Sequence, residues 1–148
     1  MNDGGGNMND GGGTSGSGAI SWKDNGTTMT SSFAAAARVK SANQDMVQIT
    51  GSNSSGVGIS FAVSTTPPLI PGSYTCGIGA NQEIVSFSYV MGSAGGNTPT
   101  CTVDIDAIGD ATGTKVTGTF SASVPLDNGM TKTVTGGVFD VAQVVNSL

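Results

Sequence analysis

The chain has 148 residues and a formal net charge of −5, and only 10% of its residues are charged, against an average share of about 25%. Its few basic residues, Arg38 and the scattered lysines, form no patch, which argues against nucleic acid as a partner. The sequence contains no histidine, which excludes a Ser-His-Asp or Cys-His catalytic arrangement.

The first part of the sequence differs sharply from the rest. Residues 1–18 read MNDGGGNMNDGGGTSGSG, and the pentapeptide NDGGG occurs twice. Such a segment has no residues that could form a core, so we predict a flexible tether over residues 1–18 and one folded domain over residues 19–148. The tether lacks the basic start and apolar stretch of a signal peptide. We expect a mature exported chain whose export signal lies upstream, and the alternative is an ordinary disordered terminus.

Beyond the tether, apolar residues recur at every second position in short runs separated by turn residues. This period of two is typical of half-buried β-strands. Pro67, Pro68 and Pro71 predict an irregular crossing, because proline cannot donate to a central ladder. The predicted strands lie near residues 20–22, 27–40, 47–51, 57–63, 73–77, 85–91, 100–107, 115–124 and 131–141. The pattern predicts an all-β domain, an antiparallel β-sandwich or flattened barrel of about nine short strands, mostly a meander.

The stretch 27–40 is ambiguous between strand and helix. Ala34–Ala37 favour a helix by propensity. The threonines and serines before them do not, and Phe33, Ala35, Ala37 and Val39 alternate along the sequence. We predict a strand here, and we expect the last residues, 142–148, to fray.

A C-terminal hairpin over residues 115–141 closes the predicted domain. Its turn is Asp127-Asn128-Gly129. A three-residue loop closed by Leu126 and Met130, with Gly129 in the left-handed region, keeps the apolar faces of both arms matched. The predicted cross-strand pairs are Val124 with Lys132, Ala122 with Val134, and Phe120 with Gly136.

The second arm of this hairpin changes phase at Gly136-Gly137. Its apolar position is even-numbered at Val134 and odd-numbered at Phe139 and Val141. One extra residue restores the phase, so we predict a β-bulge at the two glycines.

Cys76 and Cys101 are the only cysteines of the chain. Each lies in a strand-like segment on a face shared with apolar neighbours, so we predict a buried disulfide. It would close a loop of about 26 residues and stabilise the fold by roughly 3 kcal/mol in the chain-entropy model. The alternative is two buried thiols. A disulfide indicates an oxidising compartment.

The carboxylates give weak candidates for chemistry. Asp104 and Asp106 lie two residues apart on one predicted strand, a spacing that does not forbid a glycosidase pair. No aromatic cleft is evident in the sequence beyond Trp22, Tyr74 and Tyr89, and we predict no enzyme and no cofactor. Asp104, Asp106 and Asp110 are a weak candidate calcium site. A solvated acidic strand face next to a turn is the favoured interpretation.

The hairpin also carries a row of hydroxyl groups. Thr117, Thr119, Ser121 and Ser123 lie on one face of the first arm, beside Thr131, Thr133 and Thr135 of the second. An ordered array of this kind can bind ice or a repeating polymer. An ordinary exposed β-face looks the same, because threonines pair well across strands, and this is the interpretation that we favour.

Several motifs together carry a resemblance to a known family. They are AISWKDNG at 19–26, ITGSN at 49–53, VGISFAV at 57–63, PGSY at 71–74, and the closing KVTGTFSA and TKTVTGGVFDV. In this order, after a Gly/Asn/Asp-rich tether, they resemble a family of uncharacterised lipoproteins of Gram-negative bacteria, a domain of unknown function. The match covers about residues 19–141. It implies an exported β-sandwich and supplies no catalytic residues.

These observations lead to two functional expectations. The first is a non-enzymatic exported surface protein, a tethered binding or adhesion module that displays loops such as 65–72 and 92–99 to a surface polymer or a protein. The alternative is a structural subunit of an extracellular assembly or filament, built through strand edges or the N-terminal arm. We expect a location on the outer surface or in the periplasm, and a membrane tether would run through a lipidated cysteine upstream of Met1.

Overall fold

The computed structural model describes residues 19–79, 83–91, 94–95, 99–126 and 129–148. These residues form no helix, and none could therefore cross a membrane as a helix. Their strands make one twelve-stranded sheet, which confirms the all-β prediction. The strands are β1 Ile20–Asp24, β2 Thr27–Thr30, β3 Phe33–Lys40, β4 Asp45–Ser52, β5 Val57–Thr65, β6 Gly72–Thr75, β7 Gly77–Ile78, β8 Ile84–Met91, β9 Ala94–Gly95, β10 Thr100–Ile108, β11 Lys115–Pro125 and β12 Thr131–Ser147.

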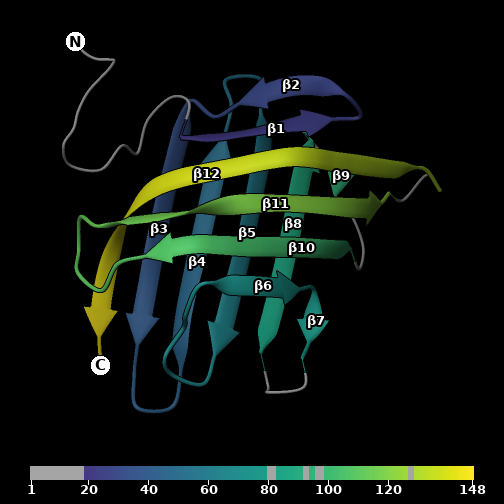
Figure 1. The fold of residues 1–148 in the computed structure, drawn as a ribbon. Coiled ribbons are helices and arrows are strands. Elements are labelled where there is room, and N and C mark those ends of the chain that lie inside the picture. Colours follow the sequence, from purple (N-terminus) through teal and green to yellow (C-terminus); the bar gives the residue numbers. More distant parts are fainter. Residues whose placement is uncertain (1–18, 80–82, 92–93, 96–98, 127–128) are drawn as a thin grey trace, which may run out of the picture.

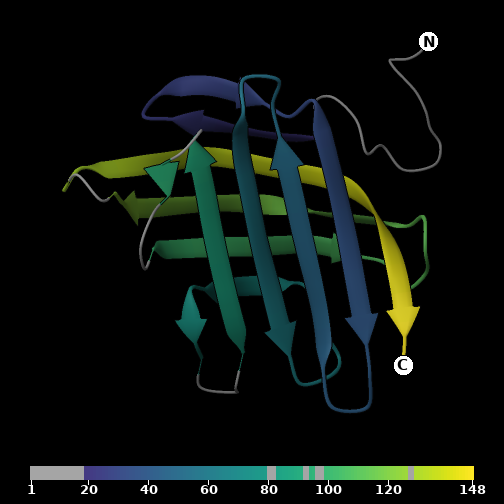
Figure 2. The same cartoon turned by 180° about the vertical axis from the view of Figure 1, so that it is seen from behind.

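The sheet folds over on itself into two layers that enclose the core. The first layer, here called the hairpin sheet, contains β6, β10, β11, the first part of β12, β1 and β2. The second layer, the meander sheet, contains the end of β12 and β3, β4, β5, β8, β7 and β9. In Figures 1 and 2 the strands of one layer cross those of the other steeply, as in orthogonal sheet packing.

Strand β12 forms the corner that joins the two layers. Its residues 134–139 pair with β1, and its residues 143–147 pair in parallel with residues 36–40 of β3. The strand bends from one layer into the other between these regions (Figure 1). The expected fraying of residues 142–148 is therefore wrong, because this tail completes the meander sheet at its edge.

The closing hairpin has the predicted turn and register over most of its length. Leu126 N donates to Met130 O at 2.7 Å, and Gly129 has φ 83°, as expected for the three-residue loop. Asp127 and Asn128 lie outside the described residues. Val124 faces Lys132 and Ala122 faces Val134, as predicted.

The bulge in β12 is present, with one correction to the pairing. Phe120 lies opposite Gly137 and not Gly136, because Thr135 and Gly136 together face Ser121. Gly136 takes the positive φ, 59°, while Gly137 lies beneath the Phe120 ring, where an added Cβ would come within 2.5 Å of ring carbons. The phase change that the sequence predicted is confirmed, since Phe139 is buried and Val138 is exposed.

The predicted strand over 27–40 is two strands. Asn25 and Gly26, both with positive φ, make the two-residue turn between β1 and β2. The chain then breaks at Ser31, whose buried hydroxyl accepts a hydrogen bond from Ile20 N at 3.1 Å. Beyond this break, β3 confirms a strand in place of a helix.

The inward face of β3 is the one without the larger apolar residues. Ala34, Ala36 and Arg38 are buried, while the Phe33 side chain is 51% exposed. Small side chains on this inner face leave room for the aromatic cluster at the centre of the core. There, the Phe61 ring lies 4.9–6.0 Å from three other rings, those of Phe87, Phe120 and Phe139.

Arg38 is the buried charge that this inner face brings into the core. Its Nε and Nη2 donate to the two carboxylate oxygens of Asp45 at 2.9 and 2.8 Å, and both residues are 1% exposed. Arg38 Nη1 donates to Gly109 O, and Asp45 Oδ2 accepts from Leu69 N at 3.0 Å. The pair thereby ties the loops after β5 and β10 to the meander sheet.

Candidate functional site

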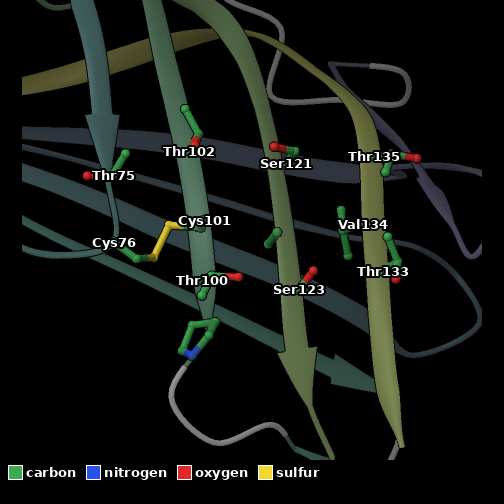
Figure 3. A pocket seen from close by; sticks show the side chains of 12 residues that line it. Thr75, Cys76, Thr100, Cys101, Thr102, Ser121, Ser123, Thr133, Val134 and Thr135 are labelled. Atoms are coloured by element: carbon green, nitrogen blue, oxygen red, sulfur yellow. A yellow bond between two sulfur atoms is a disulfide. The ribbon is translucent and has the colours of Figure 1, made fainter.

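An open groove of about 500 Å³ lies on the hydroxyl face of the hairpin sheet. Figure 3 shows its lining, which comes from the strands β10, β11 and β12 and from the end of β6. The lining residues are Thr75, Cys76, Pro99, Thr100, Cys101, Thr102, Ser121, Ala122, Ser123, Thr133, Val134 and Thr135. Among these residues none carries a charge, so the groove is neutral and rich in hydroxyl groups.

The register of the strands arranges these hydroxyls in two rows across the sheet. One row runs from Thr100 through Ser123 to Thr133. The other pairs Thr75 with Thr102 and Thr102 with Ser121. Neighbouring strands are about 4.8 Å apart, so the hydroxyls of one row are spaced closely enough to contact a single extended ligand.

The hydroxyl groups of the groove are available to a ligand. In the part of the chain that the structure describes, none of the seven serine and threonine hydroxyls makes a hydrogen bond to the protein. Each hydroxyl offers one donor and two acceptor lone pairs. The groove can therefore both donate to and accept from an uncharged polar ligand, and a charged ligand would find no opposite charge among these residues.

Two local features give the groove its shape. The bulge at Gly136 lies next to Thr135 at one side, and a bulge bends its strand and increases the local twist. At the other side, the disulfide joins Cys76 to Cys101, and Cys76 N donates to Cys101 O at 3.0 Å. Figure 3 shows this bridge at the rim of the groove, where it fastens the end of β6 to β10.

The predicted disulfide is confirmed, with Cα atoms 5.0 Å apart. Cys101 is buried and Cys76 is half-buried against the core. Not all apolar residues expected on the same strand faces as the cysteines are buried with them. Ile78, expected on the face of Cys76, is 81% exposed, and Ala107, expected on the face of Cys101, lies beyond an irregularity in β10. Disulfides form and persist in oxidising compartments, which is consistent with an extracytoplasmic setting.

The structure does not gather the calcium candidates into one cluster. Asp110 contacts Arg38 and Lys40, both at 3.2 Å. The hydrogen bond from Lys40 and the charges of both bases hold the pKa of Asp110 below its usual value. Asp104 is contacted by the Thr119 hydroxyl at 3.4 Å. Among the described residues, no three acidic or metal-ligating side chains lie together.

Part of the groove could have been found in the sequence. The hydroxyls of β11 and β12 stand out in the sequence as an alternating row. Thr100 and Thr102 alternate with Cys101 and Val103 in the same way, so the pattern in β10 was a usable signal. Thr75 could not be placed, because its contact with β10 depends on long-range pairing. Of the expected ligand loops, 65–72 is described, whereas 92–93 and 96–98 lie outside the described residues.

Fold and site together define an all-β, disulfide-linked domain with a neutral hydroxyl groove on one outer sheet face. Comparisons with protein-family models, with curated proteins and with solved structures found no match.

Proposed function

We propose that this chain is a non-enzymatic, exported binding or adhesion module that holds a neutral, hydroxyl-rich surface polymer in the groove of its hairpin sheet. The observation that carries the proposal is the set of uncharged hydroxyls on four neighbouring strands, none of which is hydrogen-bonded within the described residues. Carbohydrate hydroxyls are matched donors and acceptors for such a surface. The resemblance of its sequence motifs to lipoproteins of Gram-negative bacteria and the Cys76–Cys101 disulfide support a proposed location at the outer surface or in the periplasm. The Gly/Asn/Asp-rich segment 1–18 would serve as the tether.

The groove predicts the strength of this binding. None of the described residues that line the groove is aromatic, so they offer a sugar ring no flat apolar surface on which to stack. Binding then depends on exchanging hydrogen bonds to water for hydrogen bonds to protein, at a net gain of about 0.5–1.5 kcal/mol each. A single groove therefore binds weakly. Many copies displayed on one surface would bind a repeating polymer through avidity, which is the situation of an adhesion module.

A binding experiment with matched variants tests the proposal. Purified protein is titrated calorimetrically with neutral glucans and with an acidic polysaccharide, polygalacturonate. We expect binding of at least one neutral polymer, and we expect Thr133→Val to weaken it about 3–10-fold by removing one hydrogen-bonding group. Thr28→Val, the same change at another exposed threonine, on β2, serves as the control. Binding of the acidic polymer alone, or equal effects of both variants, would contradict the proposal.

A specific observation also favours the alternative, a structural subunit. Within the described part of the chain, β2 pairs only with β1 and β6 only with β10, so both leave an edge without a partner strand. Ile78 and Ile84, cross-strand neighbours on β7 and β8, are 81% and 51% exposed. Unprotected edges with exposed apolar residues favour strand addition by another chain.

Light scattering across a concentration series distinguishes the two functions. An assembling subunit would form concentration-dependent oligomers that Ile78→Lys disperses, whereas Ser88→Lys on the outer face of the meander sheet would not. A monomer at all concentrations would favour the binding module.

A further inference from the structure

A lysine and an aspartate meet on the core side of the hairpin sheet, where charged side chains are costly. Asp24 shares its strand face with the buried residues Ile20 and Trp22, and Lys132 shares its face with the buried Val134. Lys132 Nζ lies 2.8 Å from Asp24 Oδ1, and the two side chains are only 19% and 12% exposed. The pair joins β1, the first strand of the domain, to β12, the last.

Aromatic residues hold the aspartate in place. Tyr89, from the opposite layer, donates its hydroxyl hydrogen bond to Asp24 Oδ2 at 2.6 Å. Trp22 Nε1 donates to the same hydroxyl oxygen at 2.9 Å, and the two rings meet edge to face at 6.2 Å. Each carboxylate oxygen of Asp24 thus has a different partner, the lysine on one side and the phenol on the other.

The surroundings of Tyr89 keep that phenol protonated. Burial raises the pKa of Tyr89 well above its usual value, and the neighbouring Asp24 carboxylate raises it further. At neutral pH the phenol is therefore a permanent hydrogen-bond donor to Asp24 Oδ2. A fixed donor at the oxygen where negative charge develops is the arrangement that stabilises tetrahedral intermediates of acyl transfer.

We propose that Lys132 and Asp24 condense to an intramolecular isopeptide bond. The ammonium passes one proton to Oδ1 along the existing contact, which leaves a neutral amine beside a neutral acid. The amine nitrogen attacks Cγ, and the negative charge that forms on Oδ2 is held by the Tyr89 hydroxyl. Oδ1 takes a second proton from the nitrogen and departs as water. One C–N bond forms, one C–O bond breaks, and no oxidant or other reactant is needed.

The position of this bond would let it stabilise the fold and hold the two ends of the domain together. It closes a loop that contains most of the folded chain, so it restricts the unfolded state as a disulfide does. It would also tie the N-terminal hairpin, β1 and β2, to the long strand that connects both layers. Strands at the two ends of the domain would then stay joined when the chain is pulled.

The exposed pair Lys115–Asp140 provides an internal comparison. Its atoms lie 3.2 Å apart, but the side chains are 50% and 52% exposed. Both groups are therefore open to solvent, and among the described residues no aromatic side chain donates a hydrogen bond to Asp140. An ordinary surface ion pair of this kind remains an ion pair, so Lys115→Arg is a matched control for Lys132→Arg.

Mass spectrometry of the full-length protein, purified, reduced and denatured, tests the proposal. We expect a mass lower than that of the sequence by one water, about 18 Da, and a proteolytic fragment in which the Asp24 and Lys132 peptides are joined. Lys132→Arg should restore the full mass, Lys115→Arg should keep the loss, and Tyr89→Phe should leave a larger fraction without the crosslink.

Two results would overturn the proposal. The first is the full sequence mass in the parent protein after prolonged incubation of the folded chain. The second is a loss of water that persists in Lys132→Arg, because it would come from an aspartate succinimide and not from the lysine. The parent measurement alone decides the first point, so the test holds even where a variant fails to fold.

Discussion

At the scale of single residues, the pair Arg38–Asp45 matters most for stability. Burying two charges costs several kcal/mol per ion, which only good geometry and further hydrogen bonds offset. Here both oxygens of Asp45 and all three guanidinium nitrogens of Arg38 have partners. The pair thereby fixes the backbone of Leu69 and Gly109 in the loops after β5 and β10.

Removing one partner should therefore be costly. Asp45→Asn leaves the buried Arg38 charge with only the exposed carboxylate of Asp110 as a partner. We expect a loss of about 3–5 kcal/mol in the free energy of unfolding. Urea denaturation followed by Trp22 fluorescence measures it. The double variant Arg38→Met/Asp45→Leu, which removes both charges, should lose much less, and equal losses in the two proteins would contradict this account.

The same pair predicts an acid limit to stability. Burial alone would raise the pKa of Asp45, but the hydrogen bonds from Arg38 and Leu69 N hold it below the usual 3.8. Because the folded pKa is the lower one, the contribution of Asp45 is complete above the usual pKa and is lost as pH falls through the folded value. Stability measured from pH 6 down to about pH 2 should fall more steeply in the parent than in Arg38→Met/Asp45→Leu, and parallel curves would contradict the assignment.

At the scale of elements, β12 connects the two layers, because it pairs with β1 and β11 in one and with β3 in the other. Its bulge keeps the apolar face inward on both sides of Gly136. Gly137 then lies against the Phe120 ring. Gly137→Ala should cost about 1–3 kcal/mol, as expected when a methyl group is forced into a packed site.

Gly58→Ala is the matched control for this change. Gly58 is also a strand glycine, but its added Cβ would meet only Gly51 O at 3.9 Å. We expect an effect within about 0.5 kcal/mol or a slight gain. Thermal melts of both variants measure the difference, and equal melting temperatures would mean that Phe120 does not cover Gly137.

Sequence patterns captured the strands and the local turns, because alternation and turn residues act over a few neighbours. These patterns could not show which face of β3 points inward, because alanines occupy both of its faces. The inner face also carries Arg38, and hydrophobicity patterns predict that an arginine is exposed. The partner of Arg38, Asp45, could only be seen once β3 and β4 were paired. For the same reason only part of the groove could be predicted from the sequence. Thr75 and β10 become part of it through long-range strand pairing, which the sequence does not show.

At the scale of the whole molecule, the parallel pairing of β12 with β3 joins the two layers. Deleting residues 143–148 removes this pairing and the buried Gln143, which donates to Gly109 O at 2.6 Å. We expect a loss on the order of 3–5 kcal/mol, a large part of the 5–15 kcal/mol typical of a domain. Deleting Leu148 alone, which is 88% exposed, should change little. A truncated chain as stable as the parent in urea would show that the joint is dispensable.

The central claim is that the groove of the hairpin sheet binds a neutral polymer, and amide chemical-shift mapping tests it most directly. Isotope-labelled protein is titrated with a neutral glucan oligosaccharide, with the outer face of the meander sheet as the internal reference. The account predicts saturable shifts that cluster at Thr102, Ser121, Ser123 and Thr133 and are weakened in Thr133→Val. Shifts that cluster on the meander sheet, or no shifts at millimolar neutral oligosaccharide, would contradict it.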